Sequence, residues 1–257
     1  MAIDRALIEK TLDDLEAGRV RVAQKIDGKW KVNLEIKQII LEGFKLSEVQ
    51  DMSLGQFNFF DKDLFPVQGF RQEQGVRIVP GGSSVRRGAH LAKGVIVMPP
   101  AYINVGAFVD EGTMVDSHVT IGSCAQVGKH IHISASTQIG GVLEPAGAMP
   151  TIIEDNAFIG GNCGIYEGTI VEEGAVIASG VIITSSTAIY DATKGEFLPK
   201  NADERVVVPR GAVVVSGSRP IVKGAAADSG MHLYCPVIVK YRDDKTSRSV
   251  SLEEFLR

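Results

Sequence analysis

Aliphatic residues recur at every sixth position over most of this chain. Stepping by six from Val79 meets an aliphatic side chain at eleven consecutive positions, the last being Ile139, and a second run of seven extends from Ile153 to Ile189. The residue two places before each of these aliphatics is nearly always small or β-branched. A period of six fits neither a helix nor a simple amphipathic strand, and it is typical of a parallel β-helix, in which each hexapeptide supplies a short strand and a turn. The pattern therefore predicts a mainly β fold with stacked coils, which we call the prism.

Two segments break the period and predict loops outside the prism. Residues 141–150 (GVLEPAGAMP) interrupt the stepping, and residues 190–204 form a second polar interruption, after which Val208 and Val214 resume the spacing. Long loops in a compact repeat fold usually have a function. We expect them to cover a ligand that lies along the prism.

The segments before and after the repeat have patterns of their own. Residues 4–17 predict a helix ended by Gly18, Asp27-Gly28 predicts a turn, and residues 32–41 predict a second helix that ends at Gly43. The tail contains a strand-like run at 234–241 and a helical pattern at 252–256. We therefore divide the chain into a mostly α-helical N-terminal domain (1–70), the prism (71–220) and a C-terminal tail (221–257). Both flanking segments are expected to cap the exposed strand edges of the prism.

Composition and charge narrow the function classes. The chain of 257 residues is 44% hydrophobic and 23% charged, as in a globular protein, and its net charge of −4 gives no basic surface for nucleic acid or an anionic membrane. No apolar segment has the length of a membrane span, and three widely spaced cysteines suit a reducing compartment, so we expect a cytoplasmic protein. The 28 glycines and 6% aromatic residues fit a core of small and β-branched side chains.

Several longer motifs resemble one family, the tetrahydrodipicolinate N-succinyltransferases of the hexapeptide-repeat class. These are RVAQKIDGKWKVN at 21–33, VDEGTMVDS at 109–117, GGVLEP at 140–145 and LYCPVIVKYRDDKT at 233–246, so the resemblance spans nearly the whole chain. It implies a left-handed β-helix with eighteen residues in each coil, and a homotrimer with active sites between adjacent prisms. The implied reaction is succinyl-CoA-dependent N-succinylation of tetrahydrodipicolinate to N-succinyl-2-amino-6-oxopimelate, in the diaminopimelate–lysine pathway. Succinyl-CoA enters as a co-substrate, and no metal or redox cofactor is implied.

The resemblance also assigns site residues. Asp116 matches the substrate-binding and catalytic carboxylate of the family, acting as a base or as a covalent acyl carrier, and Arg77 matches the arginine that binds a substrate carboxylate. Glu167 is a second acid–base candidate, with Asp110 as another helper or an ordinary turn carboxylate as the alternative. One branch of the family carries a glutamate where this chain has Gly164, so a mechanism that needs that glutamate does not transfer directly.

The CoA-binding positions follow from the same resemblance. Backbone amides are expected to bind the pantetheine arm at four small residues: Ala135, Gly161, Ala178 and Ser179. Small side chains at these positions would also satisfy the fold without any ligand. Basic side chains near the end of the chain are either contacts for CoA phosphates or solvated surface charges: Lys223, Lys240 and Arg242.

Other chemistries remain open from the residues alone. An acetyl-CoA-dependent N-acetyltransferase acting on the same or a related amine is the nearest alternative. A zinc carbonic-anhydrase-like protein would use His118, His130 and His132, but His118 and His130 are twelve residues apart and fall on different corners of an eighteen-residue coil. A β-helix scaffold without activity is a third class. The three cysteines are expected to pack as small apolar residues and not to act as nucleophiles.

Overall fold

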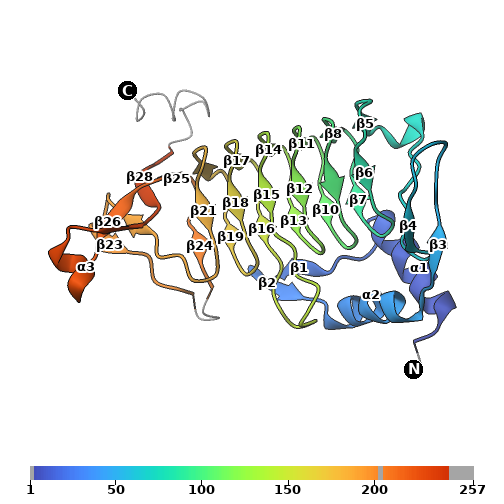
Figure 1. Ribbon diagram of the computed structural model, residues 1–257, viewed down its shortest axis with the longest axis horizontal. Coiled ribbons are helices and arrows are strands. Elements are labelled where there is room, and N and C mark those ends of the chain that lie inside the picture. The colour runs from blue at the N-terminus through green and yellow to red at the C-terminus, as the bar shows by residue number, and fades with distance from the viewer. Residues whose placement is uncertain (1–2, 202–204, 243–257) are drawn as a thin grey trace.

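Three parallel β-sheets form a long triangular prism (Figure 1). The structure, a computed structural model, describes residues 3–201 and 205–242. Sheet I contains β7 (His90–Leu91), β10 (Phe108–Val109), β13 (Gln126–Val127), β16 (Ile152–Ile153), β19 (Ile170–Val171) and β24 (Val207–Val208). Sheet II begins with β5 (Arg77–Ile78), β8 (Ile96–Val97), β11 (Met114–Val115), β14 (His132–Ile133), β17 (Phe158–Ile159) and β20 (Val176–Ile177). Sheet III contains β6 (Ser84–Val85), β9 (Tyr102–Ile103), β12 (Thr120–Ile121), β15 (Gln138–Ile139), β18 (Gly164–Ile165) and β21 (Ile182–Ile183).

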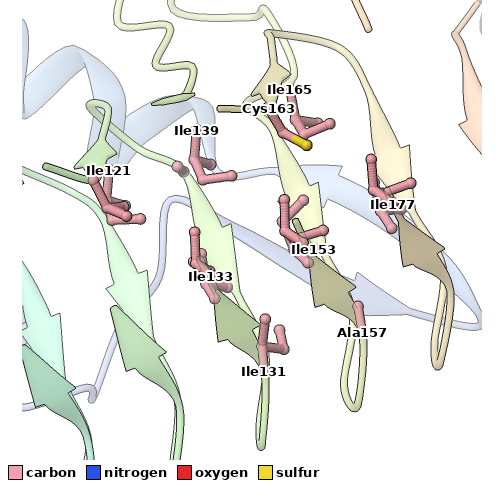
Figure 2. Packing of buried hydrophobic residues seen from close by; sticks show 14 of the residues in the cluster. Ile121, Ile131, Ile133, Ile139, Ile153, Ala157, Cys163, Ile165 and Ile177 are labelled. Atoms are coloured by element: carbon pink, nitrogen blue, oxygen red, sulfur yellow. The ribbon is translucent and has the colours of Figure 1, made fainter. Parts of the chain in front are cut away.

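The register of these strands confirms the repeat. Phe108 pairs with Gln126 and Phe158 pairs with Val176, so one coil takes eighteen residues. The second residue of each strand points inward, and these side chains fill the prism with branched aliphatics (Figure 2). Ile121, Ile133 and Ile153 are all nearly or completely buried. The parallel β-helix predicted from the six-residue period is confirmed.

In the first coil, the inward residue lies one position earlier than the six-residue period predicted. Ile78, not Val79, is the inward residue of β5, because Ile78 pairs with Val97 and packs against the core. Both residues are aliphatic, so periodicity alone could not choose between them. One extra residue is accommodated before β6. As a consequence, Arg77 occupies the outward position of its strand.

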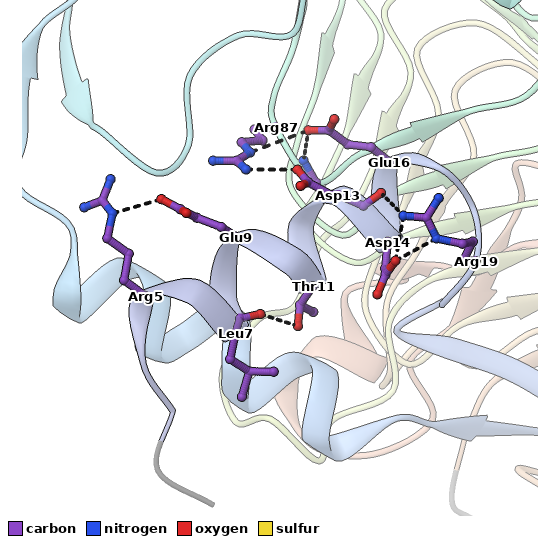
Figure 3. A network of polar contacts seen from close by, with 10 residues as sticks. Arg5, Leu7, Glu9, Thr11, Asp13, Asp14, Glu16, Arg19 and Arg87 are labelled. Carbon is purple, nitrogen blue, oxygen red and sulfur yellow. Dashed lines mark hydrogen bonds and ion pairs between the residues drawn. The ribbon is translucent and has the colours of Figure 1, made fainter.

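Two helices cover the edge where the chain passes from sheet III to sheet I, which we call the III–I edge. Helix α1 (Arg5–Glu16) begins at Asp4, whose carboxylate accepts a hydrogen bond from the Leu7 amide at 2.9 Å. Ile8 and Leu12 of α1 pack with Val105 and Cys124 of the prism. Figure 3 shows the polar side of this contact, where Arg87 of the prism lies 3.0 Å from a carboxylate oxygen of Asp13.

Helix α2 (Leu34–Leu46) is longer than predicted. The sequence predicted an end at Gly43, but the helix continues to Leu46. A Cβ atom at position 43 would lie 2.9 Å from the Phe65 ring and 3.0 Å from Ile8. Gly43 therefore permits close packing of α2 against Phe65 and Ile8, and it does not end the helix as predicted.

Short strands complete the region before the prism. The predicted turn at Asp27-Gly28 joins β1 (Ala23–Ile26) to β2 (Lys29–Val32), and this hairpin lies on sheet I, where Ala23 packs with Ile152. A second hairpin pairs β3 (Val49–Asp51) with β4 (Phe60–Lys62), and a short 3-10 helix, η1 (Gln72–Gln74), precedes β5.

The second interruption of the repeat is partly a strand hairpin. Within 190–204, predicted as a polar loop, β22 (Tyr190–Asp191) pairs with β23 (Glu196–Phe197), and both extend sheet II. The predicted strand at 234–241 is found as β27 (His232–Tyr234) and β28 (Val237–Tyr241). Strand β28 pairs antiparallel with β25 (Ala212–Val215) on one side and parallel with β22 on the other, so it joins the β22–β23 hairpin to the rest of sheet II.

A small projecting unit completes the chain that the structure describes. It contains β26 (Ser218–Pro220), paired with β27, and the one-turn helix α3 (Ala225–Asp228). The predicted helix at 252–256 lies outside the described residues. Across 3–201 and 205–242, no helix is long and apolar enough to cross a membrane.

Candidate active site

Most of the predicted site residues lie along one edge of the prism. The turns from sheet II to sheet III stack on one another and form what we call the II–III edge. They contain Asp116-Ser117-His118, Ser134-Ala135-Ser136, Gly160-Gly161-Asn162 and Ala178-Ser179-Gly180. Backbone hydrogen bonds join successive turns, from Ser136 to Ser117 at 2.8 Å and from Asn162 to Ala135 at 3.0 Å. The fold therefore brings Asp116 and all four predicted CoA-binding positions to a single edge.

Asp116 is held by backbone contacts and remains accessible. Its amide donates to the Ile133 carbonyl at 3.0 Å, and its Oδ1 accepts a hydrogen bond from the Ser117 amide at 2.7 Å. Its Oδ2 lies 3.8 Å from Nε2 of His132, and its side chain is 27% exposed. One carboxylate oxygen is thus fixed by the turn, while the other faces an imidazole and solvent.

The contact between Asp116 and His132 was not predicted from the sequence, where His132 was a candidate only as a metal ligand. His132 lies on β14, directly beside Met114 of β11, because the two residues pair across eighteen positions. Laying out the hexapeptides in coils of eighteen would have placed His132 next to the turn that carries Asp116. The available signal was therefore the coil length, not a local motif.

Arg77 lies on the same face of the prism as this pair. It occupies the outward row of sheet II, two strands from Met114, since β5 pairs with β8 and β8 with β11. Two strand spacings separate those rows by roughly 10 Å. The Arg77 side chain is exposed, and no hydrogen bond or ion pair joins it to another residue of the described chain. Its guanidinium can therefore meet a carboxylate of a ligand bound near Asp116.

The other candidate carboxylates lie on different edges. Glu167 follows β18 at the III–I edge, where the amide of the neighbouring Gly168 donates to the Met149 carbonyl at 3.1 Å. Asp110 follows β10 at the edge between sheets I and II, the I–II edge. Within one chain, neither side chain shares the edge that carries Asp116.

The loop at 141–150 also lies away from Asp116 of its own chain. It is fixed to α2 by Lys37, a fully buried lysine whose ammonium donates to the Ala148 carbonyl at 2.9 Å. Burial lowers the pKa of Lys37. Leu143 packs against the cluster formed by the two helices. The loop thus covers the III–I edge, next to Glu167.

Gly164 leaves space that Tyr166 fills. A Cβ atom at position 164 would lie 2.6 Å from Cε2 and 3.0 Å from the hydroxyl of Tyr166, and 3.0 Å from Ile182. The tyrosine ring therefore folds back over the outward position of β18. A glutamate at this position would require Tyr166 to move away.

The four predicted CoA-binding residues differ in their surroundings. Ala178 is buried and belongs to the core of the prism, whereas Ser179 is exposed. A Cβ atom at Gly161 would lie 3.2 Å from the Ala135 carbonyl, so the turns approach closely at this point. Among the residues that the structure describes, the backbone amides of Ala135, Gly161 and Ser179 donate to no protein acceptor. These amides form a series of free donors along the II–III edge.

The basic residues near the chain end do not gather at this edge. Arg242 donates from its guanidinium to the Gly174 carbonyl at 3.0 Å and from its amide to the Gly211 carbonyl at 2.7 Å, which places it at the I–II edge. Lys240 lies on β28, and Lys223 lies in the projecting unit.

The histidines and cysteines form no cluster typical of metal or thiol chemistry in the described part of the chain. His118 lies on the II–III edge and His130 on the I–II edge, as the spacing predicted. Within 3–201 and 205–242, no three His, Cys, Asp or Glu side chains gather at one point. All three cysteines are buried, and burial raises the pKa of Cys124 to about 12 and raises that of Cys163. These two thiols are therefore neutral at physiological pH.

Comparisons with known proteins match both the N-terminal region and the prism. A family model described as "Tetrahydrodipicolinate N-succinyltransferase N-terminal" matches residues 2–46, and one described as "Hexapeptide repeat of succinyl-transferase" matches residues 150–185.

Curated relatives named 2,3,4,5-tetrahydropyridine-2,6-dicarboxylate N-succinyltransferase align over nearly the whole chain. The relative from Methylococcus capsulatus is 48% identical over 257 residues, covering 98% of this chain and 90% of its own length. The relative from Aromatoleum aromaticum is 46% identical and covers 98% of this chain and 89% of its own length. The relative from Actinobacillus succinogenes is 44% identical and covers 100% of this chain and 90% of its own length. A crystal structure of a hexapeptide-repeat acetyltransferase from Vibrio cholerae aligns with 49% of this chain and 68% of its own, with 21% identity and a TM-score of 0.36. The sequence relatives, and not this structural likeness, bear on the family.

Proposed function

Since this chain belongs to the 2,3,4,5-tetrahydropyridine-2,6-dicarboxylate N-succinyltransferase family, we propose that it transfers the succinyl group of succinyl-CoA to the amine of the opened cyclic substrate. The product is N-succinyl-2-amino-6-oxopimelate, an intermediate on the route to diaminopimelate and lysine. One observation carries the proposal: the II–III edge combines an accessible carboxylate, Asp116, with a line of free backbone amides.

We assign the chemical roles from this geometry. The amine nitrogen attacks the thioester carbonyl, the C–N bond forms and the C–S bond breaks. Asp116 accepts the proton that the amine loses, and this proton then neutralises the departing CoA thiolate. Arg77 binds a carboxylate of the dicarboxylic substrate through its guanidinium, a geometry suited to paired hydrogen bonds. The amides of Ala135, Gly161 and Ser179 bind the pantetheine arm, while Ala178 maintains the turn from inside the core.

We propose that three copies of the chain assemble with their active sites between adjacent prisms. Two observations support this arrangement. Arg77 on the outer face of sheet II and Asp116 on the II–III edge have side chains open to solvent, and Glu167 lies on a different edge of the same chain. We assign Glu167 as the second acid–base carboxylate of the site, and a neighbouring prism is then needed to bring it to Asp116. We retain the division into units 1–70, 71–220 and 221–257 as part of this proposal, together with a cytoplasmic location.

Mixing subunits tests the shared site. Asp116→Asn and Glu167→Gln should each inactivate the homotrimer, because each removes one carboxylate from every site. Trimers assembled from an equal mixture should regain about a quarter of the wild-type sites, since random assembly pairs two intact side chains at one interface in four. Activity should be measured on trimers whose mixed composition is verified by mass. An active Glu167→Gln homotrimer, or no recovery in mixed trimers, would contradict a site shared in this way.

The donor assay tests the reaction itself. We expect rapid CoA release when the wild-type protein receives the cyclic dicarboxylate and succinyl-CoA, and much slower release with acetyl-CoA. Faster release with acetyl-CoA would keep the acceptor and change the donor. If a folded protein releases no CoA with either donor, the proposed function is wrong.

A further inference from the structure

We propose that His132 is a positioning residue that holds Asp116 in its working orientation and takes part in its proton transfer. The inference rests on the proposed function, because it concerns the same carboxylate. It adds to the site an imidazole from the neighbouring coil, which neither the sequence motifs nor the family comparisons indicate.

The fold fixes the imidazole beside the carboxylate. His132 is the outward residue of β14, and its strand neighbours are Met114 of β11 and Phe158 of β17. The Phe158 ring lies 5.4 Å from the imidazole, at an angle of 50° between the two planes. The Phe158 ring packs beside the imidazole on one side. Nε2 lies toward the start of the II–III turn, 3.8 Å from Oδ2 of Asp116.

The two oxygens of Asp116 have separate partners. Oδ1 accepts the Ser117 amide at 2.7 Å, which fixes the plane of the carboxylate, and Oδ2 is 3.8 Å from Nε2 of His132. This second distance is that of an ion pair, longer than a hydrogen bond. Contacts between catalytic groups often tighten when substrate binds, so a small rotation of either side chain can close the gap.

The electrostatic surroundings leave Asp116 as the charged partner of His132. The side chains that flank His132 on the two adjacent strands, Met114 and Phe158, are uncharged. Nε2 of His132 and Oδ2 of Asp116 lie 3.8 Å apart, within ion-pair distance. An imidazole nitrogen can accept a proton as well as donate one. His132 can therefore take on the proton that Asp116 receives from the amine.

Two substitutions separate the polar role of His132 from its packing role. His132→Phe keeps a ring against Phe158 but removes the nitrogen, and we expect kcat to fall about 10- to 100-fold while the KM for succinyl-CoA changes little. His132→Gln returns an amide group near the position of Nε2 and should recover part of kcat. Both variants should give a pH–rate profile that differs from that of the wild type. His232→Phe is the matched control, because His232 is exposed and contacts Ser218 of the projecting unit.

A measurement that does not depend on activity completes the test. The chain has five histidines, so ¹³C-labelled histidine signals can be assigned with single variants and followed by NMR. Asp116→Asn should shift the ring signals of His132, because the neighbouring negative charge is lost, and should leave those of His90 and His232 unchanged. His132 signals that do not shift, or a His132→Phe variant with the wild-type pH–rate profile, would overturn the inference. If the wild type releases no CoA but His132 still responds to Asp116, the pair stands and the proposed function fails.

Discussion

Asp116→Asn is expected to reduce CoA release by about 10³-fold, because the variant keeps the shape of the side chain but cannot accept the proton of the attacking amine. The Ser117 amide can still donate to the amide oxygen of asparagine, so the turn should keep its conformation. The measurement is the steady-state rate with saturating succinyl-CoA, together with the affinity for CoA alone. We expect the rate to fall and the affinity for CoA to change little, since the amides of Ala135 and Gly161 are unaffected.

An exposed carboxylate on another edge provides the control for Asp116. Glu111 lies at the I–II edge, where its carboxylate is 3.6 Å from Nζ of Lys129. Glu111→Gln should leave the rate within about twofold of the wild type, since exposed ion pairs contribute little. An Asp116→Asn variant as active as Glu111→Gln would remove Asp116 from the chemistry.

The same pair of proteins distinguishes the two roles considered for Asp116. A covalent acyl carrier should gain the mass of one succinyl group when the wild type meets succinyl-CoA without the acceptor. A base should gain none. Intact-protein mass spectrometry of the wild type, with Asp116→Asn as the blank, decides between them.

Asp191→Asn is expected to lower the free energy of unfolding by about 2 kcal/mol at pH 7. The Asp191 side chain is completely buried where β22 meets β28. Burial acts to raise its pKa, but hydrogen bonds from Thr193, Tyr241 and Lys194 outweigh that effect and lower the pKa to about 2. The Tyr241 hydroxyl donates at 2.7 Å and the Thr193 hydroxyl at 2.6 Å. Asparagine carries no charge and accepts these hydrogen bonds more weakly, so the attachment of β22 to β28 should weaken.

The pH dependence of this loss gives a second check. Because the pKa of Asp191 is lower in the folded chain than its ordinary value of 3.8, its stabilising contribution is fully present above that value. The contribution disappears as the pH falls from about 4 to about 2. The difference between the wild type and Asp191→Asn should therefore be constant from pH 7 to pH 5 and should shrink below pH 4.

Denaturant unfolding followed by circular dichroism measures this difference at one protein concentration, because assembly also affects apparent stability. Asp228→Asn is the control, since Asp228 is exposed on α3, and it should change stability by less than about 0.5 kcal/mol. A difference between the wild type and Asp191→Asn that stayed constant down to pH 3 would mean that charge is not the source of the stabilisation.

Local patterns in the sequence determined the architecture of this protein. The six-residue period predicted the β-helix, because each inward side chain needs only its own strand to point it into the prism. The pattern over residues 4–17 and Gly18 predicted α1 for the same reason, since the signal that ends a helix acts within one turn. The VDEGTMVDS and GGVLEP motifs indicated the family, and the left-handed winding came with that resemblance.

Only the tertiary structure decided which side chains meet. Ile78 was chosen over Val79 by its pairing with Val97, and α2 passes Gly43 because Phe65 packs there. His132 reaches Asp116 from the next coil, whereas Glu167, predicted as a second acid–base candidate, lies on another edge. These relations join residues that are far apart in the chain, and their geometry depends on coil length, insertions and side-chain packing together. The pattern along the chain predicts the strands and turns, but the contacts between coils form only when the coils stack.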